Sequence, residues 1–172
     1  MKNFSHDRTP DGKEEWLTDP KILSALGQFD LDPCVPINRP WDTAKHYYTI
    51  EDDGLRQKWF GRVWLNPPYG EKTGRFLKVL AEHGDGIALV YARTETNFFF
   101  PWVWDYADSI FFFKGRLLFY NVDGTPCTNK KTGKIEKAGA PSCLIAYGEE
   151  NSKVLQSLPF HGKFVQLKGD KC

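Results

Sequence analysis

The sequence predicts one α/β domain whose last strands pair in antiparallel fashion. Residues 62–66 have the pattern of a short apolar strand, 73–83 that of an amphipathic helix, and 86–91 that of a strand buried on both faces, an alternation typical of a parallel sheet. From residue 109 onward strand patterns dominate, which favours antiparallel pairing at the sheet edge. The 172 residues suffice for the core of one ordinary domain and are too few for two.

A short helix is expected near the N-terminus, after a polar segment, residues 1–15, that we expect to be flexible. Asp19 and Pro20 have the form of an N-cap and a first helical residue, and Gly27 follows the last apolar position as a helix end. The same kinds of signal predict the rest of the chain. In order, they indicate a strand at 29–32, an irregular segment at 34–60, the strand–helix–strand unit already described, an aromatic helix at 97–107, strands at 109–113, 116–120 and 142–147, a helix at 151–157 and a last strand near 164–167.

Composition excludes several classes of protein. The 26 aromatic residues and the 41% of hydrophobic residues are atypical of a disordered chain. No apolar run reaches the roughly 18 residues of a membrane span, and no signal-peptide segment follows the start. We therefore expect a soluble cytoplasmic protein with no membrane partner. Its scattered cysteines predict free thiols rather than disulfides or a zinc site: Cys34, Cys127, Cys143 and Cys172.

The net charge of +1 conceals an uneven distribution. Residues 1–60 carry a net charge of −3, whereas residues 114–140 hold six basic side chains against two acidic ones, a net charge of +4. The lysines of that stretch stand among turn-forming residues, so we expect a basic loop or hairpin insert over 121–141. Such an insert is either a solvated surface loop or an arm that contacts the phosphates of a nucleic acid.

One motif stands out, Asn66-Pro67-Pro68-Tyr69, directly after strand residues 63–65 and before a helix. Ligands of open α/β sheets bind beyond the carboxyl ends of strands. Two prolines make a rigid turn, the Asn66 amide oxygen and the Pro67 carbonyl can accept hydrogen bonds, and Tyr69 offers a flat ring for stacking. The alternative is an ordinary Pro-Pro turn with a surface tyrosine.

These groups suit the methylation of an exocyclic amino group. The amine of adenine is a poor nucleophile, because its lone pair is delocalised into the ring. Acceptors at Asn66 and Pro67 would take both N–H hydrogens and direct the lone pair at an electrophile, so no strong general base is needed before attack. A base inside a duplex cannot reach such a turn, so the target nucleotide would be flipped out and stacked on Tyr69. One ring of Phe98-Phe99-Phe100 is a further candidate for base stacking, since the three cannot all face one core.

Over about residues 15–147 the sequence resembles the phage-type DNA adenine-N6 methyltransferases, relatives of the Dam family that use S-adenosylmethionine. The resemblance rests on these segments: Trp16-Leu17-Thr18-Asp19-Pro20, Phe29-Asp30-Leu31-Asp32-Pro33, Asp53-Gly54-Leu55 with Trp59, Val63 to Gly70, and Gly115-Arg116-Leu117. It implies an abbreviated Rossmann-like S-adenosylmethionine-dependent methyltransferase sheet with antiparallel C-terminal edge strands, in a single methyltransferase domain over residues 1–172. It also implies two sets of site residues. The catalytic set is Asn66, Pro67, Pro68 and Tyr69, and the cofactor-binding set is Trp16, Thr18, Pro20, Asp32, Pro33 and Asp53.

The chain departs from that family's pattern in its cofactor half. The segment after Asp32 lacks the usual glycine-rich loop, and 34 positions separate Asp32 from Asn66, too few for the customary two strands and two helices. We assign ribose binding to Asp53, whose run of polar neighbours is equally typical of a solvated turn. Asp32 has an alternative role as the cap of a local turn. Trp16 has an alternative role as a core residue, although its aromatic ring could also attract a sulfonium cation through a cation–π interaction.

The predicted activity is therefore methyl transfer from S-adenosylmethionine to adenine N6 in DNA. The expected nucleic-acid contacts are Arg116, Lys130, Lys131, Lys134 and Lys137, with a surface ion pair as the alternative for Arg116. Two rival functions remain open: another amino-group methyltransferase, acting on RNA or on a protein glutamine, and a DNA-binding relative that has lost its cofactor. If a phage or prophage encodes the chain, the cytoplasm is that of a bacterial host. The sequence predicts neither the target site nor the oligomeric state.

Overall fold

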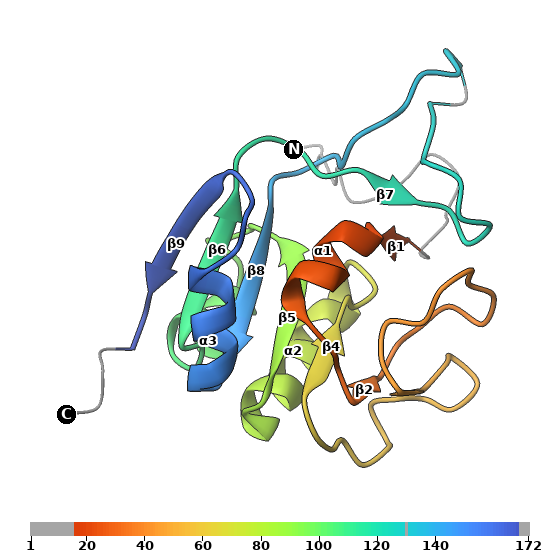
Figure 1. Ribbon diagram of the computed structural model, residues 1–172. Coiled ribbons are helices and arrows are strands. Elements are labelled where there is room, and N and C mark those ends of the chain that lie inside the picture. The colour runs from red at the N-terminus through yellow and green to blue at the C-terminus, as the bar shows by residue number, and fades with distance from the viewer. Residues whose placement is uncertain (1–15, 130, 169–172) are drawn as a thin grey trace, which may run out of the picture.

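A mixed sheet of seven strands forms the centre of the computed structural model, which describes residues 16–129 and 131–168 (Figure 1). Four neighbouring strands run parallel, while β8 runs antiparallel to β5 and β6, and β9 runs antiparallel to β6. The predicted mixed α/β class, with antiparallel strands from the C-terminal part, is confirmed. Across the sheet the strands are β3 (His46–Tyr47), β2 (Leu31–Asp32), β4 (Val63–Leu65), β5 (Gly86–Tyr91), β8 (Ser142–Tyr147), β6 (Ser109–Phe113) and β9 (Gly162–Gln166).

A second sheet pairs two distant segments, β1 (Leu17–Thr18) and β7 (Phe119–Tyr120), in antiparallel register. In Figure 1 this pair lies beside the start of α1 (Pro20–Leu26), at the base of a long arm that follows β7. The strand predicted at 116–120 is thus shorter than expected. Its partner is the N-terminal segment, a pairing that no local sequence pattern signals.

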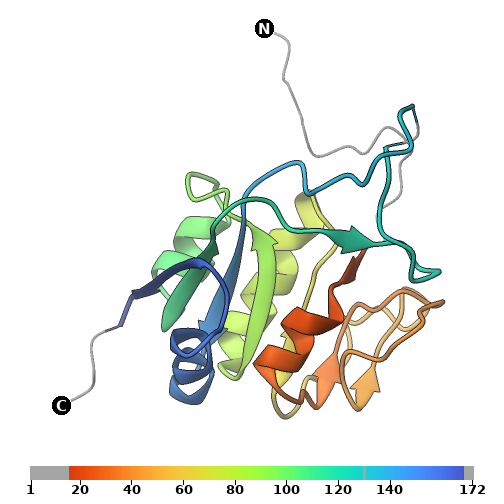
Figure 2. The same cartoon turned by 45° about the horizontal axis from the view of Figure 1, so that its top comes forward.

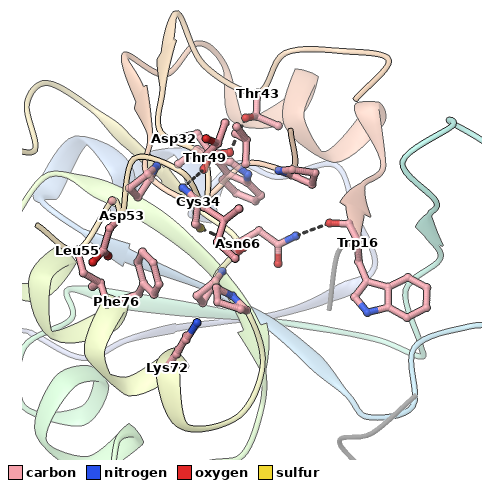
Figure 3. A pocket seen from close by; sticks show the side chains of 18 of the residues that line it. Trp16, Asp32, Cys34, Thr43, Thr49, Asp53, Leu55, Asn66, Lys72 and Phe76 are labelled. Atoms are coloured by element: carbon pink, nitrogen blue, oxygen red, sulfur yellow. Dashed lines mark hydrogen bonds between the residues drawn. The ribbon is translucent and has the colours of Figure 1, made fainter. Parts of the chain in front are cut away.

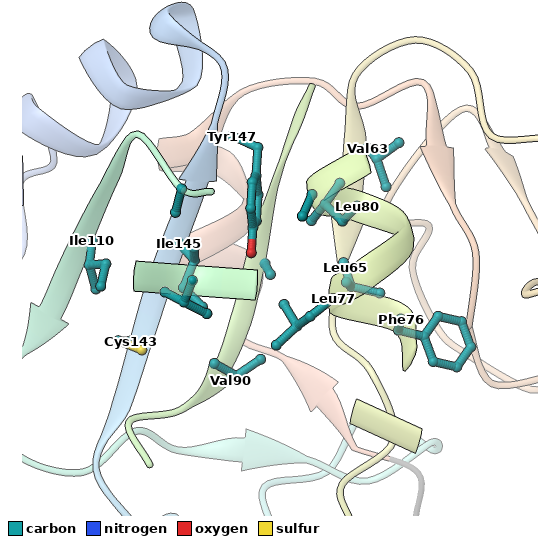
Figure 4. Close-up of a cluster of buried hydrophobic side chains, with 14 of the residues drawn as sticks. Val63, Leu65, Phe76, Leu77, Leu80, Val90, Ile110, Cys143, Ile145 and Tyr147 are labelled. Atoms are coloured by element: carbon teal, nitrogen blue, oxygen red, sulfur yellow. The ribbon is translucent and has the colours of Figure 1, made fainter. Parts of the chain in front are cut away.

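Helices cover both faces of the large sheet, so the domain has three layers (Figures 1 and 2). Because successive strand side chains point to opposite faces, Val63 and Leu65 pack in one core and Trp64 in the other, all three with no exposed surface. Figure 4 shows the first core, where Leu77 and Leu80 of α2 (Glu71–His83) lie over the strands. The second core lies under α1 and α3 (Glu149–Gln156).

Local capping chemistry explains the helix boundaries that were predicted. The Asp19 carboxylate accepts from the backbone N–H of Lys21 at 2.8 Å, and Gly27 ends α1 as expected. Gly84 ends α2 in the left-handed conformation (φ 79°). Helices α2 and α3 each begin two residues earlier than their predicted starts at 73 and 151.

The aromatic helix predicted at 97–107 is wrong in extent and type. Only Phe100–Trp104 form a helix, η1, and its turn is wide, with the Asp105 N–H donating to the Phe100 carbonyl at 3.2 Å. Its apolar residues also do not share one buried face, since Val103 is buried whereas Tyr106 is 44% exposed. Pro101 at the start of η1 removes a backbone donor, which a longer regular helix would have used.

The segment between β2 and β4 is short and irregular, as predicted, apart from the two residues of β3. It contains no helix between residues 33 and 62, all of which are described. The chain therefore passes from β2 to its neighbour β4 through turns that fold over the end of β2. Within the two described ranges, no helix has the length and apolar character to cross a membrane.

The cysteines of the described ranges are free thiols, as predicted: Cys34, Cys127 and Cys143. Cys172, residues 1–15 and Lys130 lie outside the described residues.

Candidate active site

A cavity of about 440 Å³ lies at the carboxyl ends of the parallel strands β2 and β4, beside β1. Four segments that are far apart in the sequence meet there, because parallel neighbours end at the same edge of a sheet. They are residues 16–18, 32–36, 53–56 and 66–69, joined by side chains of the first turns of α2. Figure 3 shows Asn66 near the middle of this cavity, with Asp32 and Cys34 above it, Trp16 to one side and Lys72 below.

The predicted catalytic residues Asn66, Pro67, Pro68 and Tyr69 all line this cavity. Five of the predicted cofactor residues line it too: Trp16, Thr18, Asp32, Pro33 and Asp53. Pro20 does not belong to the cavity wall. It is the exposed first residue of α1, where its fixed φ angle suits the start of a helix.

The side-chain amide of Asn66 has a defined orientation. Its nitrogen Nδ2 donates to the Trp16 carbonyl at 3.1 Å and to Thr18 Oγ1 at 3.4 Å. Its oxygen Oδ1 is buried and accepts no hydrogen bond from any described residue. A buried acceptor without a donor carries a desolvation cost of about 1–3 kcal/mol, which is recovered when a ligand supplies an N–H group. The amide thus presents an acceptor to the cavity.

The turn after Asn66 is held from both sides. Pro67 is buried, and the carbonyl of Pro68 accepts from Thr73 Oγ1 at 2.8 Å, which ties the turn to the start of α2. On the other side, Cys34 Sγ donates to the backbone carbonyl of Asn66 at 3.4 Å. Burial raises the pKa of the Cys34 thiol well above its usual value, so it stays protonated and remains a donor.

Tyr69 is half-buried and stacks on Tyr91, the last residue of β5. The ring centroids are 4.2 Å apart and the planes differ by 10°. Tyr69 is therefore a fixed ring in the wall of the cavity and not a loose surface side chain. One of its faces is covered by Tyr91, which limits stacking with a ligand to the other.

Asp32 is a buried carboxylate, only 3% exposed. Thr43 Oγ1 donates to it at 2.5 Å, and the backbone N–H of Cys34 donates to it at 3.1 Å. The second bond is the local turn cap that was the alternative role of Asp32, and the residue fills that role while also lining the cavity. Burial, partly offset by these hydrogen bonds, raises the pKa of Asp32 from an ordinary 3.8 to about 6.

Asp53 lies in a turn, which is the alternative considered for it, and it also lines the cavity. Its φ is positive, 50°, and its carboxylate pairs with Arg56 at 3.2 Å. The neighbouring Gly54 passes so close to Pro33 that a Cβ atom would lie 1.9 Å from the Pro33 carbonyl oxygen. The indole N–H of Trp59 donates to the Gly54 carbonyl at 2.8 Å. This close approach closes the cavity over the end of β2.

The indole of Trp16 is half-buried and packs against the core under α1, which is the core role weighed for it. The contribution of Trp16 to the site is its carbonyl group, the acceptor for Asn66. Sequence reasoning missed three residues that support the site, Thr43, Cys34 and Tyr91. Their types are common in any strand or loop, so nothing in the local sequence marks them.

A second cavity, of about 260 Å³, shares Tyr69 with the first. Its other lining residues come from the start of α2 and from the end of β5 and the segment after it. Phe98 packs closely on α2 because residue 74 is a glycine, where a Cβ atom would lie 2.7 Å from the Cβ of Phe98. Of the three consecutive phenylalanines, Phe98 lines this cavity, Phe99 is fully buried and Phe100 is 56% exposed. Arg93, Glu95 and Thr96 also line it.

Lys131, Lys134 and Lys137 lie on the arm that follows β7 and projects from the body of the domain (Figure 2), whereas Arg116 lies between β6 and β7. The arm is a hairpin, with a β-bridge between Thr128 and Ile135 and a backbone hydrogen bond from the Asn129 N–H to the Lys134 carbonyl. Its base packs against the loop that covers the cavity, since Trp41 meets Tyr120 edge-on at 5.7 Å. The predicted contacts Arg116, Lys131, Lys134 and Lys137 are all exposed, and none of them lines either cavity.

Comparison with known proteins gives one match. A family model described as DNA N-6-adenine-methyltransferase (Dam) matches residues 7–156 of the chain. No curated protein and no solved structure matches the chain significantly.

Proposed function

The chain belongs to the Dam family of DNA N-6-adenine-methyltransferases, and from this premise we propose that it transfers a methyl group from S-adenosylmethionine to the exocyclic amine of a flipped-out adenine. Membership of the family implies methylation of adenine N6 in DNA in general. The observation that most supports this mechanism concerns Asn66 Oδ1. This buried acceptor faces the cavity, and no donor among the described residues forms a hydrogen bond to it.

The large cavity fits the proposed cofactor in size and in the chemistry of its walls. Its volume of about 440 Å³ lies in the ordinary range of small-molecule sites. Asp32, Pro33 and Asp53, which line it, would hold the cofactor, with Asp53 proposed as the ribose ligand. A cation near Asp32 would favour the ionised form of this carboxyl. When bound there, S-adenosylmethionine supplies an electrophilic methyl group on a positively charged sulfur.

The residues of the turn activate the target amine. Asn66 Oδ1 and the carbonyl of Pro67 accept its two hydrogens, which favours a tetrahedral nitrogen and directs the lone pair away from the adenine ring. The carbonyl of Pro68 already accepts from Thr73, so we assign the second acceptor to Pro67. No strong base acts before attack, because the extra proton becomes acidic once the nitrogen carries the methyl group.

Tyr69 would stack on the target base. Its contact with Tyr91 fixes the ring plane beforehand. The Tyr69 side chain therefore loses little conformational entropy when a base packs on the opposite face. An adenine in a duplex has no access to such a pocket, and the nucleotide must leave the helix to reach it.

The arm would hold the DNA. Arg116, Lys131, Lys134 and Lys137, together with Lys130, would neutralise phosphates and release counterions. The base of the arm packs on the loop over the cavity, so a DNA backbone held by the arm would lie close to the site. We further propose that the parallel strands β3, β2, β4 and β5 are an abbreviated Rossmann-like methyltransferase sheet, in which β3 and turns replace the usual helices.

Incubation of the full chain with tritiated S-adenosylmethionine and DNA, RNA or protein in parallel tests this function. The expected result is label in DNA alone, recovered as N6-methyladenine after digestion to nucleosides. Label in RNA or protein would support another amino-group methyltransferase. A chain that binds DNA but gives no label and no calorimetric binding of S-adenosylmethionine would be a non-catalytic relative.

A further inference from the structure

The amide of Asn66 is oriented by a strand outside the main sheet. A carbonyl oxygen can only accept hydrogen bonds, so the atom 3.1 Å from the Trp16 carbonyl must be the amide nitrogen. A rotation of the amide by 180° would place two acceptors in contact and direct the N–H₂ group into the cavity. The contact with Trp16 therefore decides which end of Asn66 the cavity receives.

Thr18 supplies the second half of this anchor. It is 2% exposed, and its Oγ1 lies 3.4 Å from the same nitrogen. Its position is set by the short ladder between β1 and β7, in which Thr18 is the Cα partner of Phe119. The hydroxyl oxygen thus accepts from Asn66, whereas the family resemblance implied a role in cofactor binding for Thr18.

We propose that Thr18 is a positioning residue that, with the Trp16 carbonyl, holds the Asn66 amide so that Oδ1 faces the target amine. This inference rests on the proposed function. A fixed acceptor at this point favours a ligand group that donates N–H···O hydrogen bonds. It repels a ligand carbonyl oxygen in the same place. The strand β1 thereby contributes to substrate choice through Asn66.

Two matched variants of the full chain separate positioning from cofactor binding. Thr18→Val keeps the side-chain shape and removes the hydroxyl, whereas Thr18→Ser keeps the hydroxyl. We expect Thr18→Val to lower kcat about tenfold, the effect of one lost hydrogen bond. The KM for DNA and the calorimetric Kd for S-adenosylmethionine should stay within about twofold. Thr18→Ser should restore kcat to within about threefold of the unaltered chain.

Weaker cofactor binding with an unaltered kcat would overturn the proposal, because Thr18 would then be a cofactor contact. An unaltered kcat together with unaltered binding would overturn it as well.

A second measurement does not depend on activity. The side-chain N–H₂ signal of Asn66 is identified in ¹⁵N NMR spectra by its absence from Asn66→Ala, and its hydrogen exchange is compared with that of the exposed Asn97. Slower exchange at Asn66, accelerated by Thr18→Val, supports the anchor even if the chain methylates no DNA and the proposed function fails. Exchange as fast as that of Asn97 would overturn the anchor. If Thr18→Val does not fold, the exchange rates of Asn66 and Asn97 in the unaltered chain decide whether the Asn66 amide is anchored.

Discussion

Tyr69 and Tyr91 stack with their ring centroids 4.2 Å apart and their planes within 10° of each other. Tyr69 ends the turn after β4 and Tyr91 ends the neighbouring strand β5, so the contact joins two adjacent strand ends. The ring of Tyr69 is thereby held before any ligand binds. The turn at 66–69 is held in three ways, by this stack, by the Thr73 bond to Pro68 and by the Cys34 bond to Asn66.

Replacement of Tyr69 by Leu should lower kcat/KM for DNA by about 5- to 100-fold, because stacking of a base on an aromatic ring contributes about 1–3 kcal/mol. Tyr69→Phe should retain most activity, since the ring remains. Tyr91→Leu should give a smaller loss in the same direction, because it removes only the support. Steady-state kinetics with duplex DNA measures all three, and full activity of Tyr69→Leu would refute the stacking role.

Asn66→Ala should abolish methyl transfer, with a loss of at least about 100-fold in kcat, because it removes the acceptor for the amine. The Kd for S-adenosylmethionine, measured by calorimetry, should change by less than about threefold. Thermal unfolding of the same variant serves as the control for folding. Retained activity in a folded Asn66→Ala chain would contradict the mechanism.

Cofactor affinity should increase as the pH rises through about 6, because ionisation of Asp32 then supplies a negative charge for the cationic ligand. Calorimetry at pH 5 and pH 8 measures this change, and Asp32→Asn should bind weakly at both values. The stability effect has the opposite sign. The folded carboxyl holds its proton more tightly than an unfolded one, whose pKa is near 3.8, so its contribution to the free energy of unfolding falls between about pH 4 and pH 6.

Gly54→Ala should destabilise the protein by about 1–3 kcal/mol and weaken cofactor binding at least tenfold. The added Cβ would lie 1.9 Å from the Pro33 carbonyl oxygen, so the loop that closes the cavity must move. Gly139→Ala is the matched control, because no atom lies within 4 Å of its added Cβ. Equal melting temperatures and affinities for the two variants would show that the Gly54 contact is unimportant.

Alanine at Lys131, Lys134 and Lys137 together should weaken DNA binding and reduce the slope of log K against log salt by up to about 3, or about 0.9 for each lost phosphate contact. Three exposed lysines elsewhere, Lys58, Lys78 and Lys163, provide a control of equal charge. Fluorescence anisotropy over a range of salt concentrations measures the slope. If both triple variants show the same slope, the arm is a solvated loop.

Local chemistry made several elements predictable. Asp19 with Pro20 and the terminal glycines mark the ends of helices, and the apolar runs of β5 and β8 match the predicted strands residue for residue. The turn at 66–69 was recognisable because two prolines after a strand leave few alternative conformations. The aromatic helix at 97–107 failed because apolar spacing alone does not distinguish a long helix from one wide turn interrupted by Pro101.

The sequence by itself determined the α/β class, the rigid turn at 66–69 and the family to which the chain belongs, since these depend on local patterns and a contiguous motif. Only the tertiary structure decided which way the Asn66 amide points, which face of Tyr69 is covered, and that the Thr18 hydroxyl accepts from Asn66. Those features depend on contacts between residues 16–18, 66–69 and 91, which are brought together by strand pairing. No local propensity specifies such contacts, because each partner's residue type is compatible with many other neighbours.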